Sequence, residues 1–99
     1  MSPIEYLEVV KGHYHCTTCM KQVPVEAHHL RSVGMGRNRK REMIEHYSAI
    51  PVCRKCHREY HDVGQAEFEK RHKVNCFEIN QDLLAKASYT YYNKEKDFG

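Results

Sequence analysis

The chain has 99 residues, of which 40% are hydrophobic and 29% are charged, so it can form one domain with only a modest core. Lysine and arginine outnumber aspartate and glutamate by 16 to 13, which gives a net charge of +3. No run approaches the roughly 20 apolar residues that a membrane-spanning helix needs, so a helical membrane protein is excluded and no membrane partner is expected.

A short helix is predicted near the beginning of the chain, over residues 3–10. Ser2 has the side chain of an N-cap, Pro3 fits the first helical turn, and Glu5 can reach back to the cap. These three positions together predict where the helix begins.

Two extended segments are predicted in the middle of the chain. Apolar and polar residues alternate over residues 23–28, which predicts a strand that ends at the histidine pair of residues 28–29. Residues 49–52 are expected to be extended because the residue before Pro51 disfavours the helical region. Between them, residues 43–47 fit either a helical turn or a loop.

Three helices are predicted after the second strand. The first should run from residue 53 or 54 to about residue 62 and end at Gly64, and the second should cover residues 65–72. Asn80 is expected to cap a last helix over about residues 81–92, which has an apolar stripe along one face.

Two Cys-x-x-Cys pairs are the most informative pattern, and they consist of Cys16, Cys19, Cys53 and Cys56. Each turn can bring two thiolates to one ion, so the two pairs predict a closed, structural Zn²⁺ site. The alternative is a redox pair, which two copies in so small a chain disfavour. The fifth cysteine, Cys76, is expected to be half-buried and without a role. Cys-x-x-Cys pairs that hold zinc rather than disulfides are typical of a reducing compartment. Because there is also no amino-terminal apolar stretch, we expect a cytoplasmic protein.

Four histidines with metal-ligand spacing lie beside the cysteines. His57 and His61 are four residues apart, so on a helix both imidazoles project from one face and can share an ion. His28 and His29 are adjacent at a strand end, where neighbouring side chains point to opposite faces. One of this pair can therefore bind metal while the other stays free as a base. A single histidine is more often an ordinary residue, but four beside zinc-type cysteines favour a second metal site.

Positive charge is concentrated in one part of the chain. Residues 31–41 include five basic residues and no acid, around a glycine-rich turn that is expected to form a mobile loop. Such runs are often only a solvated loop, but beside metal ligands this one favours a polyanion as the partner. The side chains expected to contact this polyanion are Arg31, Arg37, Arg39, Lys40 and Arg54.

These motifs resemble the His-Asn-His (HNH) nuclease family of the ββα-metal type, in its zinc-knuckle branch. The residues that carry the resemblance are Cys16-x-x-Cys19, Val25-Glu26-Ala27-His28-His29-Leu30 and Ile50-Pro51-Val52-Cys53-x-x-Cys56-His57-x-x-x-His61. The segments Val33-Gly34-Met35-Gly36-Arg37-Asn38-Arg39-Lys40 and Val63-Gly64-Gln65-x-x-Phe68 are similar to those of small HNH nucleases encoded by bacteriophages and prophages.

The resemblance covers about residues 16–74 and implies an α+β fold. It predicts a small, treble-clef-like ββα-metal core over about residues 13–75, with a four-cysteine zinc knuckle and short helices at both ends. The whole chain, residues 1–99, would then be a single HNH nuclease domain.

The resemblance also implies roles for the histidines. His29 matches the general base that deprotonates the attacking water, and His28 matches the metal-ligand position before it. His57 and His61 match the remaining ligands of one catalytic divalent cation, for which Mn²⁺, Ni²⁺, Zn²⁺ and Mg²⁺ are candidates. The implied enzyme is an endonuclease that hydrolyses DNA phosphodiester bonds while the cation stabilises the phosphorane and the leaving oxygen.

The chain departs from the HNH pattern at the middle asparagine, which pins the loop and orients the base. Ser48 stands near that position and is expected to take over this part of the catalytic site. His46 and Asn38 are alternatives if the loop folds back.

The implied substrate is DNA held mainly through its backbone, in a bacterial host cell, during phage or prophage DNA processing or recombination. A chain of this size has few elements left for reading bases, so strict recognition would need a homodimer or a phage recombination or packaging partner. The main alternative is a non-catalytic zinc module that binds nucleic acid or protein. A metalloprotease is disfavoured because no His-Glu-x-x-His sequence is present.

Overall fold

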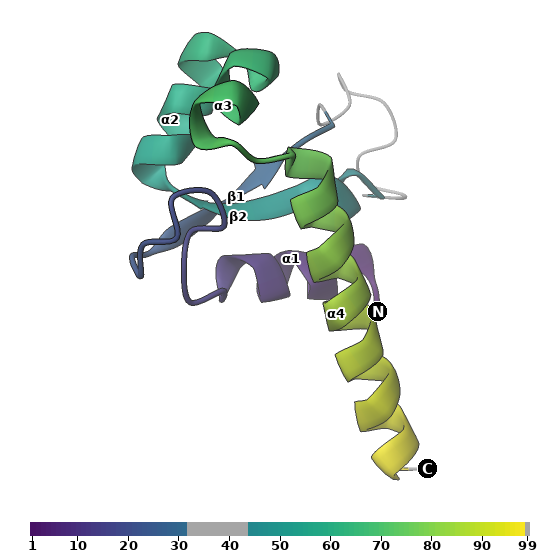
Figure 1. Ribbon diagram of the computed structural model, residues 1–99. Helices are drawn as coiled ribbons and strands as arrows, with labels where there is room; N and C mark the ends of the chain where they lie inside the picture. Colours follow the sequence, from purple (N-terminus) through teal and green to yellow (C-terminus); the bar gives the residue numbers. More distant parts are fainter. Residues whose placement is uncertain (32–43, 99) are drawn as a thin grey trace.

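The computed structural model describes residues 1–31 and 44–98 (Figure 1). This part of the chain is a small α+β structure with four α-helices and a two-stranded antiparallel sheet. The elements in chain order are α1 (Pro3–Lys11), β1 (Val25–His29), the 3₁₀ helix η1 (Ile44–Ser48), β2 (Ala49–Cys53), α2 (Arg54–Val63), α3 (Gln65–His72) and α4 (Cys76–Phe98).

The sheet lies between helices (Figure 1), with α2 and α3 above it and α1 below it in that view. β1 pairs with β2 so that His28 lies opposite Ile50 and His29 lies opposite Ala49. All of β2 is buried, as expected for a short apolar strand that is covered on both faces. α4 crosses beside the sheet, and its C-terminal half projects away from the body.

Two apolar clusters form the core. One contains Cys16, Ile50, Val52, Cys53, Cys56, Phe68 and Cys76. The other joins α1, β2 and α4 through Tyr6, Val10, Ala49 and Ala87. Three of the four predicted cysteine ligands belong to the first cluster, so an ion bound by them would be part of the core.

Several predicted elements are confirmed. α1 begins with a capping box, in which the Ser2 hydroxyl accepts a hydrogen bond from the Glu5 N–H and the Glu5 carboxylate accepts one from the Ser2 N–H. α3 covers the predicted residues, and α2 ends one residue later than predicted. The ambiguous segment before β2 is the helical turn η1.

The predicted start and end of the last helix are wrong. α4 begins at Cys76 and continues to Phe98. The side-chain oxygen of Asn75 accepts a hydrogen bond from the Glu78 N–H at 3.0 Å, which is the contact that an N-cap makes. Asn80, the predicted cap, lies inside the helix and is buried. Although α4 is long, none of the described helices is long and apolar enough to span a membrane.

Asn80 is buried because it joins α4 to the segment at the start of β2. Its Nδ2 donates to the carbonyl oxygens of Tyr47 at 2.7 Å and Ala49 at 3.2 Å, and it lies 3.3 Å from the Tyr6 hydroxyl. The Tyr6 hydroxyl itself donates to the Ala49 carbonyl oxygen. A polar group inside a core is stable when it has such partners, so this asparagine holds η1 and β2 against α4.

Candidate metal centres

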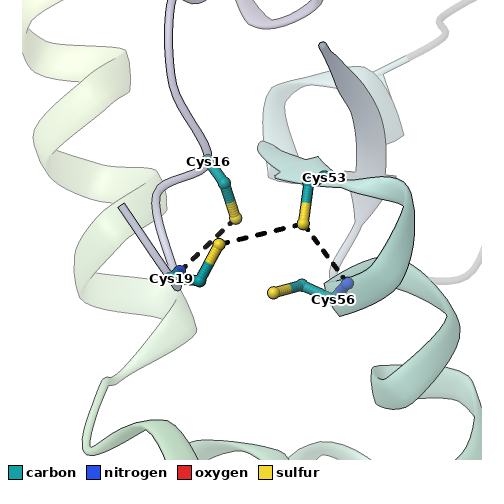
Figure 2. A group of neighbouring side chains, drawn as sticks. All are labelled: Cys16, Cys19, Cys53 and Cys56. Atoms are coloured by element: carbon teal, nitrogen blue, oxygen red, sulfur yellow. Dashed lines mark hydrogen bonds between the residues drawn. The ribbon is translucent and has the colours of Figure 1, made fainter. Parts of the chain in front are cut away.

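The four predicted zinc ligands converge in space, and Figure 2 shows their sulfurs turned toward one another. Cys16 and Cys19 come from the loop before β1, Cys53 ends β2, and Cys56 lies in the first turn of α2. The four Sγ atoms lie within 4.8 Å of one another, and those of Cys19 and Cys53 are 3.9 Å apart. Tetrahedral zinc with Zn–S bonds of about 2.3 Å separates its sulfurs by about 3.8 Å, so this group could hold a structural metal ion such as zinc.

Backbone N–H groups point at the cysteine sulfurs. The N–H groups of Thr18 and Cys19 donate to Cys16 Sγ, and that of Cys56 donates to Cys53 Sγ. Burial alone would raise the pKa of Cys16, but backbone hydrogen bonds outweigh it and lower this pKa to about 7. The turn therefore favours the thiolate of Cys16, which is the form that binds metal. Burial instead raises the pKa of Cys19 and of Cys56.

Cys76 is not part of this group. It was expected to be half-buried, but it is fully buried in the same core cluster. Burial raises its pKa to about 12, so it remains a thiol and behaves as a small apolar side chain.

A second group consists of the three predicted histidine ligands. His28 comes from β1, while His57 and His61 lie one turn apart on α2. One ring nitrogen of each lies within 4.8 Å of the others. The ring centroid of His57 lies 4.9 Å from the centroids of both His28 and His61. The antiparallel hairpin and the helix that follows it therefore bring these three side chains together. The spacing predicted the pairing of His57 with His61, and the HNH resemblance implied that His28 joins them.

The clearest sign that this group could bind an ion is a buried ring nitrogen of His28. Its side chain is 3% exposed, and in the described part of the chain its Nε2 atom is buried without a hydrogen-bond partner. An unpaired buried nitrogen is costly, and a metal ion would satisfy it. Burial, together with the neighbouring histidines, lowers the pKa of His28 to about 4, so the imidazole is neutral at pH 7 and can act as a ligand.

Two further contacts position these ligands, and sequence analysis missed both. The Tyr60 ring packs against His28 with centroids 4.0 Å apart. Glu26 Oε1 lies 3.0 Å from His57 Nδ1, which leaves His57 Nε2 for an ion. A carboxylate behind a ligating histidine fixes its tautomer and orientation. The signal that could have revealed Glu26 is its position two residues before His28, on the same face of the strand.

The histidine group borders an open hollow of about 280 Å³. Its walls are formed by Glu26, Arg54, His57, Arg58, His61 and Asp62. Arg54 and Arg58 are both exposed, and guanidinium groups beside an ion site suit a phosphate ligand. Of the other predicted DNA contacts, Arg31 is exposed, whereas Arg37, Arg39 and Lys40 lie outside the described residues.

His29 is separated from the group, as the strand alternation predicted. Its side chain is half-buried, and its Nε2 atom lies 2.8 Å from Nδ1 of His46 in η1. Burial is the main cause that lowers the pKa of His29, and the nearby His46 lowers it further. In a neutral imidazole one ring nitrogen carries the proton and the other can accept one, so Nδ1 of His29 is a proton acceptor if Nε2 donates to His46.

The hydroxyl of Ser48, predicted to replace the motif's asparagine, forms hydrogen bonds only with backbone groups in the described part of the chain. Its hydroxyl donates to the Glu45 carbonyl oxygen at 2.7 Å and accepts a hydrogen bond from the Arg31 N–H at 3.1 Å. The side chain thus fixes the two sides of the connection between β1 and β2. Asn38, the other residue considered for this role, lies outside the described residues.

The fold and the two ligand groups together define a small α+β protein with a cysteine cluster suited to zinc. A family model described as DUF968, a protein of unknown function, matches residues 2–89. The chain therefore belongs to the DUF968 family. No curated protein and no solved structure matches it.

Proposed function

We propose that this protein is a metal-dependent endonuclease of the HNH type that hydrolyses DNA phosphodiester bonds. The observation that carries the proposal is the group of His28, His57 and His61, in which a buried nitrogen of His28 has no hydrogen-bond partner among the described residues. The half-buried His29 lies outside this group. β1, β2 and α2 follow one another in the order of a ββα-metal core, which supports the resemblance.

In the proposed reaction His29 acts as the general base. It takes a proton from water, the water oxygen forms a bond to phosphorus, and the bond from phosphorus to the 3′ oxygen breaks. The leaving oxygen then takes a proton from solvent. A divalent cation held by His28, His57 and His61 would supply Lewis acidity at the phosphate, with Mn²⁺, Ni²⁺, Zn²⁺ and Mg²⁺ as candidates.

Binding of DNA is proposed to depend on the backbone rather than on bases. Arg54 and Arg58 border the hollow beside His57 and His61, where they would hold flanking phosphates. The basic stretch that includes Arg37, Arg39 and Lys40 is proposed to add further phosphate contacts. Phage or prophage DNA processing, and a homodimer or a phage partner for stricter recognition, remain part of this proposal.

The second candidate is a non-catalytic zinc module that binds nucleic acid. One observation favours it: Ser48 stands where the HNH motif has asparagine, and its hydroxyl bonds the backbone of its own loop. Such a module would bind DNA tightly but would not turn it over.

Nicking of supercoiled plasmid distinguishes the two candidates. Wild type, His29→Ala and His13→Ala are compared after chelation and re-addition of Mn²⁺, Ni²⁺, Zn²⁺ or Mg²⁺, with zinc content and fold checked in parallel. His13 belongs to neither metal group, so it is the matched control. The nuclease proposal predicts nicking by wild type and His13→Ala, and a rate lower by roughly 10²- to 10⁴-fold in His29→Ala. DNA binding without nicking, with every metal, would support the zinc module instead.

A further inference from the structure

The proposed base contacts a histidine side chain that is not part of the HNH pattern. His29 Nε2 and His46 Nδ1 are 2.8 Å apart, a hydrogen-bond distance at which one proton is shared between two nitrogens. Both side chains are half-buried. We propose that His46 is a positioning residue that takes the place of the motif's asparagine and holds His29 in the tautomer whose Nδ1 is free to accept a proton. This inference rests on the proposed nuclease function.

The tautomer follows from the atoms that meet. If His29 donates its Nε2–H, His46 Nδ1 accepts, and Nδ1 of His29 is the only ring nitrogen able to take a proton from water. If instead His46 donated, His29 would carry its proton on Nδ1 and could not act as a base there. The half-buried His46 ring supports the first arrangement, since neutral histidines in contact with water favour the Nε2–H form, which leaves Nδ1 as acceptor.

His46 is held on both sides along the chain. The preceding residue, Glu45, has its carbonyl oxygen bonded by the Ser48 hydroxyl, and the following residue, Tyr47, has its carbonyl oxygen bonded by Asn80. The Leu30 N–H also donates to the Ser48 carbonyl oxygen. The turn η1 is therefore fixed to the end of β1, to itself and to α4, and it presents the His46 ring to His29 in one place.

This arrangement divides the work of the motif's asparagine between residues. Ser48 and Asn80 fix the backbone of the turn, and His46 orients the base. The side-chain contact at 2.8 Å is made by His46 and not by Ser48, whose hydroxyl is engaged with the backbone. When His29 takes up a proton, its Nε2–H still has an acceptor, so the protonated ring is stabilised by the same contact.

The first test uses kinetics with wild type, His46→Ala, His46→Asn and the control His13→Ala. His46→Ala should lower kcat for plasmid nicking by roughly 10²-fold, within the range of a general-base contribution, and should leave KM and metal content unchanged. His46→Asn, whose side-chain oxygen can accept the same hydrogen bond, should restore most of kcat. An unchanged kcat in His46→Ala, or a fall in His46→Ala that His46→Asn does not restore, would overturn the positioning role.

The second test does not depend on activity. Ring-nitrogen NMR of wild type should show His29 protonated at Nε2, and His46→Ala should lose this single tautomer. His29 protonated at Nδ1 in wild type would overturn the inference even if the protein cleaves DNA. If wild type cleaves no DNA with any metal, the nuclease proposal and the catalytic role of His46 both fall, while the NMR result still reports on the pairing.

Discussion

At the end of β1, one peptide bond separates two histidines with different surroundings. His28 points to the face covered by α2, is nearly fully buried and meets two other imidazoles. His29 points the other way and meets His46. Neighbouring side chains along a strand point to opposite faces. His28, the proposed ligand, and His29, the proposed base, can therefore be adjacent in sequence and still make separate contacts.

Removal of the Glu26 carboxylate, which contacts His57, should weaken metal binding at the histidine group. We expect Glu26→Ala to lower its affinity for Mn²⁺ by about 10- to 100-fold, because the carboxylate at 3.0 Å orients the ring. Titration of Mn²⁺ followed by electron paramagnetic resonance measures this affinity. Glu8→Ala, an exposed change on α1, is the control, and equal affinities in the two variants would contradict the assignment.

Loss of a single cysteine ligand should remove the structural ion. We expect Cys53→Ser to bind no zinc and to unfold or aggregate, because a structural zinc site contributes directly to folding. Cys76→Ala should keep a full complement of zinc, since Cys76 lies outside the ligand group. Elemental analysis and circular dichroism provide the comparison, and a folded, zinc-free Cys53→Ser protein would show that the knuckle is not needed.

Among the elements, α4 differs most from its sequence prediction. Asparagine is a residue type that caps helices, and the sequence offers Asn75 and Asn80 five positions apart. Asn75 makes the capping contact, whereas Asn80 is drawn into the core by carbonyl groups at the start of β2. Nothing local to the helix encodes those carbonyl positions.

The Asn80 contacts should contribute to stability. We expect Asn80→Ala to lower the free energy of unfolding by about 1–3 kcal/mol, because the Tyr47 carbonyl oxygen loses its Asn80 donor and the Ala49 carbonyl oxygen keeps only the hydroxyl of Tyr6. Urea denaturation measures the change. The exposed neighbour Gln81 supplies the control Gln81→Ala, and an effect of the same small size in both variants would argue against the buried network.

The elements that the sequence predicted well are those whose signals are local. The capping box at Ser2, the proline in β2, the glycine after α2 and the Cys-x-x-Cys pairs each act within a few residues, and each is found where it was expected. The metal-ligand motifs apart, contacts between distant elements could not be predicted in this way. Glu26 with His57, and Asn80 with Tyr47, join residues more than 30 positions apart, and only the packing of the sheet and helices brings them together.

In the molecule as a whole, the two ligand groups share one helix. α2 contributes Cys56 to the cysteine group and, from the next residue onward, His57 and His61 to the histidine group. An ion held by the cysteines would join the loop before β1 to the start of α2. It would therefore fix the helix that presents two of the three histidines, which explains how a chain with a modest core could hold an ion site with precision.

The most direct test of the nuclease account relates metal occupancy to nicking. Mn²⁺ binding and the rate of plasmid nicking are measured at the same metal concentrations in wild type and in His61→Ala. If the histidine-bound ion is catalytic, nicking by wild type rises in parallel with the binding of one Mn²⁺ per chain, and His61→Ala shifts both curves to higher concentration by the same factor. Full occupancy without nicking, or nicking whose metal dependence is unchanged in His61→Ala, would contradict the nuclease account.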